Sequence, residues 1–283
     1  MSRLVEGSRI NAQLLIDKVT DYVVNRQNED GGYNFCQGTE SGAQDTYYGL
    51  AILNSLNTSL PDARKTVRFL NELNLDSIYS DYYIVKGLLL CGEKIDDNLK
   101  QRIAARLSSK LYFGSVEVFS EVSSEFITTF MALELADLLQ INVRAQEVAD
   151  WLLNFRNGDG GFGTQGQSNI NSTYYAIASL NLLKQNLKEM RGTVAFVRSC
   201  EKPYGGFTVI PMNLAPYMEH TYYGVTTLDL LDEQAQYPSQ TIDFILKCQN
   251  KNGGFARSEL GISTFENTFQ AVSVLRKLGF LSL

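Results

Sequence analysis

The stretch RNGDGGFGTQGQSNINSTYYAIASLNLL, residues 156–183, places a glycine pair and an aromatic residue ahead of a segment that turns from polar to apolar. Glycine adopts positive φ at little cost, so the pair is expected to end one helix and turn the chain toward the next. The aromatic residue is expected to plug the turn against the core. The phrase recurs, and its aromatic residues are Tyr33, Phe162, Phe207 and Phe255. Four copies of one turn indicate a repeat protein.

The repeats align on a Thr-Tyr or related pair at the start of a segment rich in Leu, Ala and Ile. We take the residue before the threonine column as the anchor of each repeat, and the six anchors are Asp45, Asp81, Glu125, Ser172, His220 and Asn267. Successive anchors lie 36 to 48 residues apart, which is the period of a helical hairpin. A second amphipathic segment, such as residues 143–155, lies between anchors and has apolar residues at helical spacing. We therefore predict a single all-α domain over residues 1–283, with inner helices starting near residues 45, 81, 125, 172, 220 and 267.

Helical hairpins stack either as an open solenoid or as a closed ring. The anchored segments are strongly apolar and carry small residues one turn in, such as Gly49, Ala176, Gly224 and Ala271. The other segments carry most of the Lys, Arg and Glu. This asymmetry favours an (α/α)6 toroid of six helical hairpins, in which parallel inner helices surround a central cavity.

The bulk composition is that of an ordinary soluble globular protein, with 44% hydrophobic and 20% charged residues in 283. The net charge is -6 and there is no basic run, which argues against a nucleic-acid partner. No apolar stretch reaches the roughly 18 residues of a transmembrane segment, and we expect a cytoplasmic protein. The four cysteines are far apart and form no CxxC pair, so we expect neither a disulfide framework nor a thiolate zinc finger.

Repeats of this period, with an NxDGGF turn followed by a polar-anchored inner helix, resemble the superfamily of protein prenyltransferase β subunits and squalene or terpene cyclases. The resemblance covers nearly the whole chain and is strongest over residues 156–183, 200–231 and 248–272. It implies the toroid fold and an isoprenoid-related activity, although a shared fold does not determine chemistry.

The resemblance also implies a zinc site that this chain does not preserve. In prenyltransferase β subunits an Asp-x-Cys pair and a later His hold zinc, and the matching residues here are Asn171, Thr173 and His220. Only the histidine remains, and it is a weak candidate ligand. The Arg and Lys that would hold a diphosphate are missing from GTQGQSNI and TVIPMNLAPYM. We therefore expect no standard zinc-dependent protein prenyltransferase, and the cofactor stays open, with zinc or magnesium possible.

The cyclase branch is expected to carry an Asp-x-Asp-Asp motif that protonates the substrate. The nearest match is KIDDN, at Asp96 and Asp97, which reads instead as the N-cap of an outer helix.

Parallel inner helices would bring all anchors to one mouth of the ring. We predict that His220, Asp45, Asp81, Glu125 and Glu219 are catalytic, with the histidine as acid or base near neutral pH. Binding is assigned to Tyr48, Tyr83, Tyr175, Tyr223, Glu266, Asn267, Asn171 and Thr173. Only the second tyrosine of each Tyr-Tyr pair is expected to face the cavity, because helical neighbours lie about 100° apart. An alternative interpretation is structural: the acids would cap the N-termini of the inner helices, and the tyrosines would pack in the core.

Three functions are open to such a molecule. The leading hypothesis is a prenyltransferase- or cyclase-like enzyme that binds an apolar, isoprenoid or lipid-like molecule, or a cationic one, and performs acid-base or carbocation chemistry at an acidic mouth. The second is a non-catalytic scaffold that docks a helical partner subunit. The third is a carbohydrate-active enzyme that pairs Asp45 with Asp81, or Glu125 with Glu219.

Overall fold

The computed structural model describes residues 2–73, 76–108 and 125–281, with the side chains of residues 2–11 and 125 left aside. Within these ranges the regular structure is helical: twelve α-helices, one short 3₁₀ helix at Thr164–Gly166 and only isolated β-bridges. The α-helices are α1 (Ser2–Val24), α2 (Ala43–Ser55), α3 (Ala63–Glu72), α4 (Ile78–Leu90), α5 (Asp97–Ser108), α6 (Glu125–Leu139), α7 (Ala145–Leu153), α8 (Ile170–Leu182), α9 (Arg191–Cys200), α10 (Met218–Leu230), α11 (Pro238–Lys247) and α12 (Phe265–Lys277).

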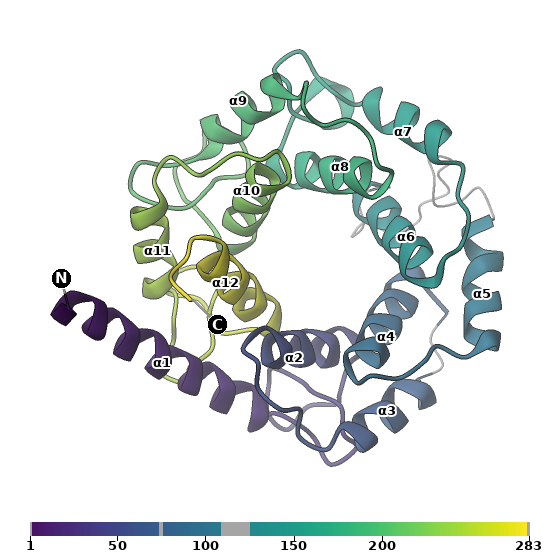
Figure 1. Cartoon of the computed structure of the whole chain (residues 1–283), viewed down its shortest axis with the longest axis vertical. Helices are drawn as coiled ribbons and strands as arrows, with labels where there is room; N and C mark the ends of the chain where they lie inside the picture. The colour runs from purple at the N-terminus through teal and green to yellow at the C-terminus, as the bar shows by residue number, and fades with distance from the viewer. Residues whose placement is uncertain (1, 74–75, 109–124, 282–283) are drawn as a thin grey trace.

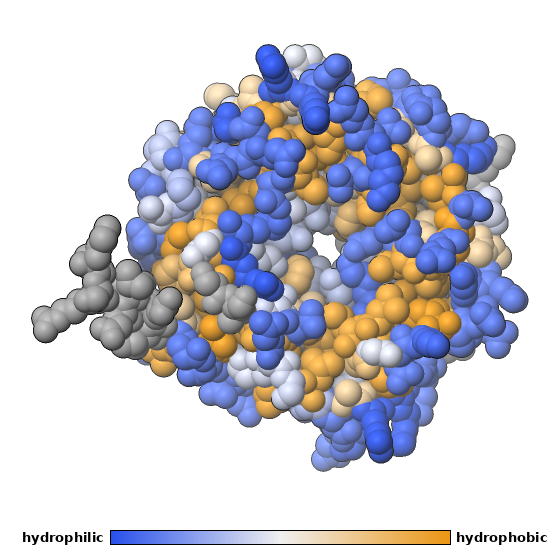
Figure 2. Space-filling model, in the orientation of Figure 1, coloured by the Kyte–Doolittle hydropathy of each residue, from blue (hydrophilic) through white to orange (hydrophobic). Residues whose placement is uncertain are grey.

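The even-numbered helices form an inner ring and the odd-numbered helices surround it (Figure 1). Each inner helix packs against the next, and α12 packs against α2, so the ring is closed. The predicted toroid is confirmed. Residues at the same position along neighbouring inner helices contact each other. Tyr175 and Tyr223 are each the sixth residue of their helix, and their hydroxyl oxygens lie 2.9 Å apart. The inner helices are therefore parallel, and the ring has an opening at its centre (Figure 2).

The glycine pairs close the outer helices as predicted. The first glycine of each pair has positive φ: 89° at Gly31, 87° at Gly160, 105° at Gly205 and 93° at Gly253. The aromatic residue that follows each pair is fully buried, which confirms its role as a plug. Its backbone N–H donates to a threonine hydroxyl of the next inner helix, through the pairs Tyr33–Thr46, Phe162–Thr173, Phe207–Thr221 and Phe255–Thr268, at 2.9 to 3.1 Å.

The same glycines join neighbouring outer helices. A Cβ atom on Gly31, Gly160 or Gly205 would lie 2.1 to 2.4 Å from the backbone at Lys65, Gly192 or Gln240, near the start of the next outer helix. On Gly253 it would lie 2.2 Å from the backbone oxygen of Lys18 in α1. No side chain fits these approaches, so the last glycine turn closes the outer layer between α11 and α1.

The predicted register is wrong in the second and third repeats. The buried column that faces the outer layer contains Thr46, Thr129, Thr173, Thr221 and Thr268, and in α4 this place belongs to Asp81. The anchor of α4 is therefore Ser80, and that of α6 is Thr128 rather than Glu125. Both repeats lack the glycine turn that marks the register of the other four. Their apolar pattern alone does not determine which residue occupies the threonine position.

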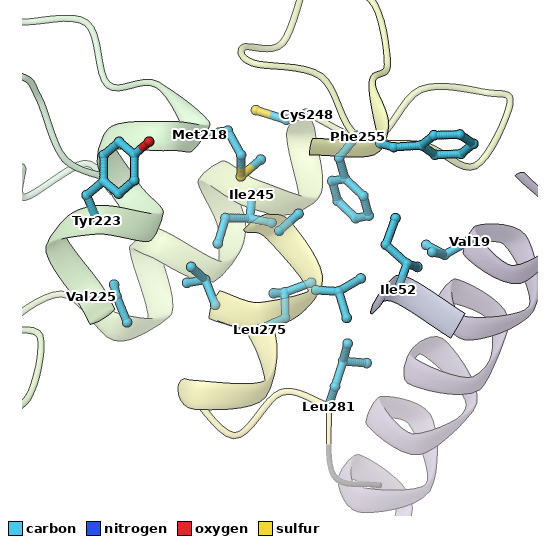
Figure 3. Packing of buried hydrophobic residues seen from close by; sticks show 14 of the residues in the cluster. Val19, Ile52, Met218, Tyr223, Val225, Ile245, Cys248, Phe255, Leu275 and Leu281 are labelled. Atoms are coloured by element: carbon cyan, nitrogen blue, oxygen red, sulfur yellow. The ribbon is translucent and has the colours of Figure 1, made fainter. Parts of the chain in front are cut away.

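The core lies between the two layers. Val19 of α1, Ile52 of α2, Ile245 of α11 and Leu275 of α12 belong to one buried cluster together with the turn residue Phe255 (Figure 3). These side chains hold inner and outer helices together and leave the inner face free to line the cavity. Within the described residues, no helix combines the length and the apolar character needed to cross a membrane.

Candidate functional site

The inner helices enclose a central cavity of about 770 Å³. Its walls are aromatic, with a few polar groups between them, as is usual for a small-molecule site. The aromatic residues are Tyr47, Tyr48, Tyr79, Tyr82, Tyr83, Phe130, Tyr174, Tyr175, Tyr222, Tyr223 and Phe269. The inner helices that line the cavity surround the central opening seen in the space-filling view (Figure 2).

Both tyrosines of each pair line the cavity, so the prediction that only the second one does is wrong. Neighbouring helical residues are about 100° apart, and each pair straddles the direction toward the ring axis. The rings pack on one another, and Tyr174 stacks on Tyr223 with centroids 4.8 Å apart. Burial raises the pKa of Tyr48 and of Tyr174 well above the ordinary value of 10.0, so these phenols stay neutral at physiological pH.

A second hollow of about 610 Å³, here called the mouth pocket, lies at the N-terminal ends of α2, α10 and α12. It is lined by Phe35, Gly42, Gln44, Asp45, Glu219, Tyr223, Arg257, Thr264, Glu266 and Asn267. Gly42, Gln44, Tyr223 and Glu266 line the central cavity as well. The mouth pocket therefore adjoins the central cavity.

Glu266, the second residue of α12, stands at the junction of the two hollows. Its carboxylate accepts long hydrogen bonds from the Tyr48 hydroxyl at 3.5 Å and from the Gln270 amide at 3.4 Å. Burial raises the pKa of this carboxyl, and the negative charges of Glu219 and Asp45 raise it further, while the Tyr48 hydrogen bond lowers it. Glu266 thus keeps its proton to higher pH than an ordinary glutamate.

Asp45 and Glu219 are the other acids of the mouth pocket. The backbone N–H of Phe35 donates to Asp45 at 3.3 Å, and burial raises the pKa of Asp45 despite this bond. Arg257 donates to Glu219 through Nε at 2.6 Å and lies over the ring of Tyr217 at 4.1 Å. Arg257, the one arginine that lines the mouth pocket, is therefore already paired with the Glu219 carboxylate.

His220 occupies the anchor position but lines neither hollow. It is buried, with Nε2 3.7 Å from Glu219 and Nδ1 without a hydrogen-bond partner among the described residues. Burial lowers the pKa of His220, Glu219 partly offsets this, and Arg257 lowers it further. The imidazole is neutral at physiological pH.

Asp81 and Thr173 line neither the central cavity nor the mouth pocket. Both belong to the column that faces the outer layer. Asp81 is fully buried and bound to Arg102 at 2.8 Å and Arg106 at 3.0 Å, both from α5. The Thr173 hydroxyl accepts from the N–H of Phe162 and donates to the carbonyl of Asn169 at 2.7 Å. The helix therefore directs both side chains away from the cavity in which their roles in catalysis and binding were predicted.

The remaining predicted residues divide by position. Tyr48, Tyr83, Tyr175 and Tyr223 line the central cavity, and Asn267 lines the mouth pocket. Asn171 does not line either hollow, and its buried Oδ1 has no hydrogen-bond partner in the described part of the chain. The Glu125 side chain lies outside the described residues. Asp96 caps α5 as predicted, accepting from the N–H groups of Asn98 and Leu99.

The residues at the zinc positions implied by the resemblance do not fit a zinc site. An amide at Asn171 and a hydroxyl at Thr173 replace the carboxylate and the thiolate, and that hydroxyl is already engaged in the turn. In the ranges that the structure describes, no three His, Cys, Asp or Glu side chains gather closely enough to hold a metal ion.

The cavity also contains a charged group that sequence reasoning missed. Lys86 of α4 donates to Glu134 of α6 at 2.7 Å and to the Tyr82 hydroxyl at 2.9 Å, and Tyr82 donates to the other oxygen of Glu134 at 2.5 Å. The available signal was a single charge inside each of two apolar inner segments, VKGLLL and MALELA. Such charges are rarely buried unless they are paired.

The fold resembles those of solved enzymes of isoprenoid chemistry. The protein geranylgeranyltransferase-I of Candida albicans, complexed with GGPP, superposes with a TM-score of 0.69 at 14% identity, over 93% of this chain and 90% of that one. The type II terpene cyclase MstE of Scytonema, in its apo form, gives 0.61 at 14% identity, over 94% and 96%. A variant of MstE in complex with geranylgeranyl dihydroxybenzoate gives 0.62 at 14% identity, over 96% and 97%.

Among curated protein sequences none matches this chain. The match to a family is extensive, however, because residues 2–80 and 100–282 fit the sequence pattern of the prenyltransferase alpha-alpha toroid domain. Together with the closed ring of paired helices, this shows that the chain belongs to the prenyltransferase α/α toroid family.

Proposed function

We propose that the protein is a cyclase-like enzyme that binds a neutral isoprenoid or similar lipid in the central cavity and protonates it with Glu266. The observation that carries the proposal is the position of Glu266. Its carboxyl has a raised pKa and lies at the junction between the acidic mouth pocket and the aromatic central cavity. The isoprenoids bound by the two structural relatives support the ligand class by analogy of fold.

The charge of the mouth pocket favours a neutral or cationic ligand over a diphosphate. Asp45, Glu219 and Glu266 face this pocket together with one arginine, Arg257, which is already paired with Glu219. A diphosphate requires free cationic donors, and this pocket offers it carboxylates instead. An allylic diphosphate is therefore a poor substrate for this site.

The chemistry follows from the arrangement of acid and aromatic rings. The O–H bond of protonated Glu266 breaks as a C–H bond forms on an alkene carbon, which leaves a carboxylate and a carbocation. Ring faces of the cavity tyrosines stabilise the cation through their negative quadrupoles. Loss of a proton from the cation to a carboxylate completes an isomerisation, and water in the mouth pocket exchanges protons with Glu266.

Glu266→Gln tests the assignment. The wild type, this variant and the control Glu259→Gln, an exposed glutamate of the loop before α12, are incubated with farnesol or geranylgeraniol. Products are followed by gas chromatography with mass spectrometry, and binding by native mass spectrometry. We expect Glu266→Gln to bind the alcohol but to lose turnover by a factor on the order of a hundred or more. Full turnover in Glu266→Gln excludes it as the acid, and the absence of bound alcohol in the wild type contradicts the ligand class.

The catalytic roles predicted for Asp45, Glu219 and His220 stay predictions. Asp45 and Glu219 act in this proposal by keeping Glu266 protonated, since their charges oppose its ionisation. The alternative that pairs Asp45 with Asp81 as glycosidase carboxylates is disfavoured in this proposal, because two arginines hold Asp81 against α5.

A binding subunit is the second candidate, and one feature favours it. The loops that precede α10 and α12 expose Met212, Leu214, Leu260 and Ile262, and Leu260 is 99% exposed. These loops border the mouth, where an apolar surface suits contact with another macromolecule. Purification of the protein in a defined complex that lacks turnover would favour this function.

A further inference from the structure

The central cavity has a neighbour at its far end. A pocket of about 330 Å³, here called the rear pocket, is lined by Tyr47, Ala51, Asn54, Ser55, Lys86, Leu89, Leu90, Leu138 and Phe269. Most of these residues belong to the last turns of α2, α4 and α6, opposite the mouth. Tyr47, Lys86 and Phe269 line both the rear pocket and the central cavity. These three side chains therefore stand at the boundary between the two spaces, and we call them the wall.

The wall is held in place by the Lys86–Glu134 ion pair. The Lys86 ammonium group has one hydrogen bond to Glu134, another to Tyr82, and stands 5.0 Å from the ring centroid of Tyr47. Glu134 accepts from Lys86 on one oxygen and from Tyr82 on the other. These bonds use two of the three ammonium donors and one acceptor site on each carboxylate oxygen, so they hold both charged groups in one position.

We infer that the Lys86–Glu134 pair, with Tyr47 and Phe269, forms a partition that limits how far an apolar chain entering from the mouth can extend. The inference rests on the proposed function, since it assigns the residues that determine ligand length at the same site. A chain that fills the central cavity meets the Lys86 stem and the two rings. A longer chain has to displace an ion pair whose side chains are 17% and 23% exposed, which is costly because both charges would lose their partners.

The partition gives different expectations for two substitutions of one residue. Lys86→Ala removes the stem and joins the rear pocket to the central cavity. Lys86→Met removes the charge but keeps a side chain of similar length in the same place. Phe269→Ala opens the wall from α12 without touching the ion pair, and so serves if Lys86→Ala does not fold. Adding Asn54→Trp to Lys86→Ala fills the rear pocket from the exposed side.

The test measures the dissociation constants of farnesol, geranylgeraniol and longer linear polyprenyl alcohols by titration calorimetry. We expect the wild type and Lys86→Met to share one preferred length. In Lys86→Ala the preference shifts to a longer alcohol, by at least about tenfold in the ratio of affinities, because every newly buried methylene adds affinity. Asn54→Trp in the Lys86→Ala background restores the original preference.

Crystal structures of Lys86→Ala and Lys86→Met give a readout that needs no ligand. A continuous void in the alanine variant and a divided one in the methionine variant support the partition. The inference is overturned if the void stays divided in Lys86→Ala, or if both variants change length preference equally. If the wild type binds no alcohol at all, the proposed ligand class fails, and the two crystal structures still decide whether Lys86 divides the space.

Discussion

At the scale of single residues, the direction in which a helix position points decides whether a polar side chain lies in the core or in a pocket. Asp45 and Asp81 carry the same carboxyl and both lie near the start of an inner helix. Asp45 lines the mouth pocket, whereas Asp81, in the threonine column, faces α5. A shift of one position, about 100° around the helix axis, separates a site residue from a core ion pair.

The substitution Asp81→Asn should destabilise the fold. It removes the fully buried carboxylate that binds both arginines, so that Arg106, 16% exposed, keeps only the exposed Asp76 as a carboxylate partner in the described residues, while Arg102, 42% exposed, is partly compensated by water. We expect a loss of about 2–3 kcal/mol in the free energy of unfolding, measured by urea denaturation. The matched control is Asp76→Asn, which removes an acid bound to the same Arg106 but 85% exposed, and it should cost less than about 1 kcal/mol. Equal losses would contradict a structural role specific to Asp81.

At the scale of elements, the glycine turn is the device that assembles the ring. It ends an outer helix, places an aromatic residue between the layers and brings the backbone against the next outer helix. The turn after α11 makes this approach to α1, so the first and last hairpins meet through the same contact as the interior ones.

Gly253→Ala should weaken the closure of the ring. Its Cβ would overlap the backbone oxygen of Lys18, and the residue would have to keep a φ of 93°. We expect a loss of roughly 2–4 kcal/mol in the free energy of unfolding, from strain in the backbone and overpacking together. Gly38→Ala is the control, because Gly38 has a φ of 80° and nothing within 4 Å of the added Cβ, so only about 1 kcal/mol is expected there. Thermal denaturation of the two variants measures the difference, and similar values would show that the contact with Lys18 is unimportant.

At the scale of the whole molecule, the ring collects charges that are remote in sequence. Asp45 of α2, Glu219 of α10 and Glu266 of α12 share one pocket because the parallel inner helices present their N-termini at one mouth. Helix N-termini favour negative charge, which offsets part of the mutual repulsion of these acids.

This arrangement predicts a pH-dependent stability. The folded pKa of Glu266 is raised above its ordinary value of 4.5, so the folded chain holds this proton more tightly than the unfolded chain. Stability is therefore lost as the pH rises from about 4.5 through the folded pKa. Glu266→Gln cannot ionise, so its free energy of unfolding should increase relative to the wild type over this range, and level off above it. Urea denaturation across pH measures this difference, with the exposed Glu259→Gln as the control variant. A difference that is constant with pH would contradict the raised pKa.

The sequence by itself determined the repeat, the helical hairpins, the glycine turns with their buried aromatics and the tyrosine-rich inner face. These features depend on the φ of glycine, on helix caps and on apolar spacing, which act over a few residues. Only the tertiary structure decided that Asp81 pairs with α5, that both tyrosines of each pair face the cavity, and that Lys86 and Glu134 meet inside it. Those outcomes depend on how each helix is rotated about its own axis relative to its neighbours. Packing between the helices sets this rotation only when the ring closes.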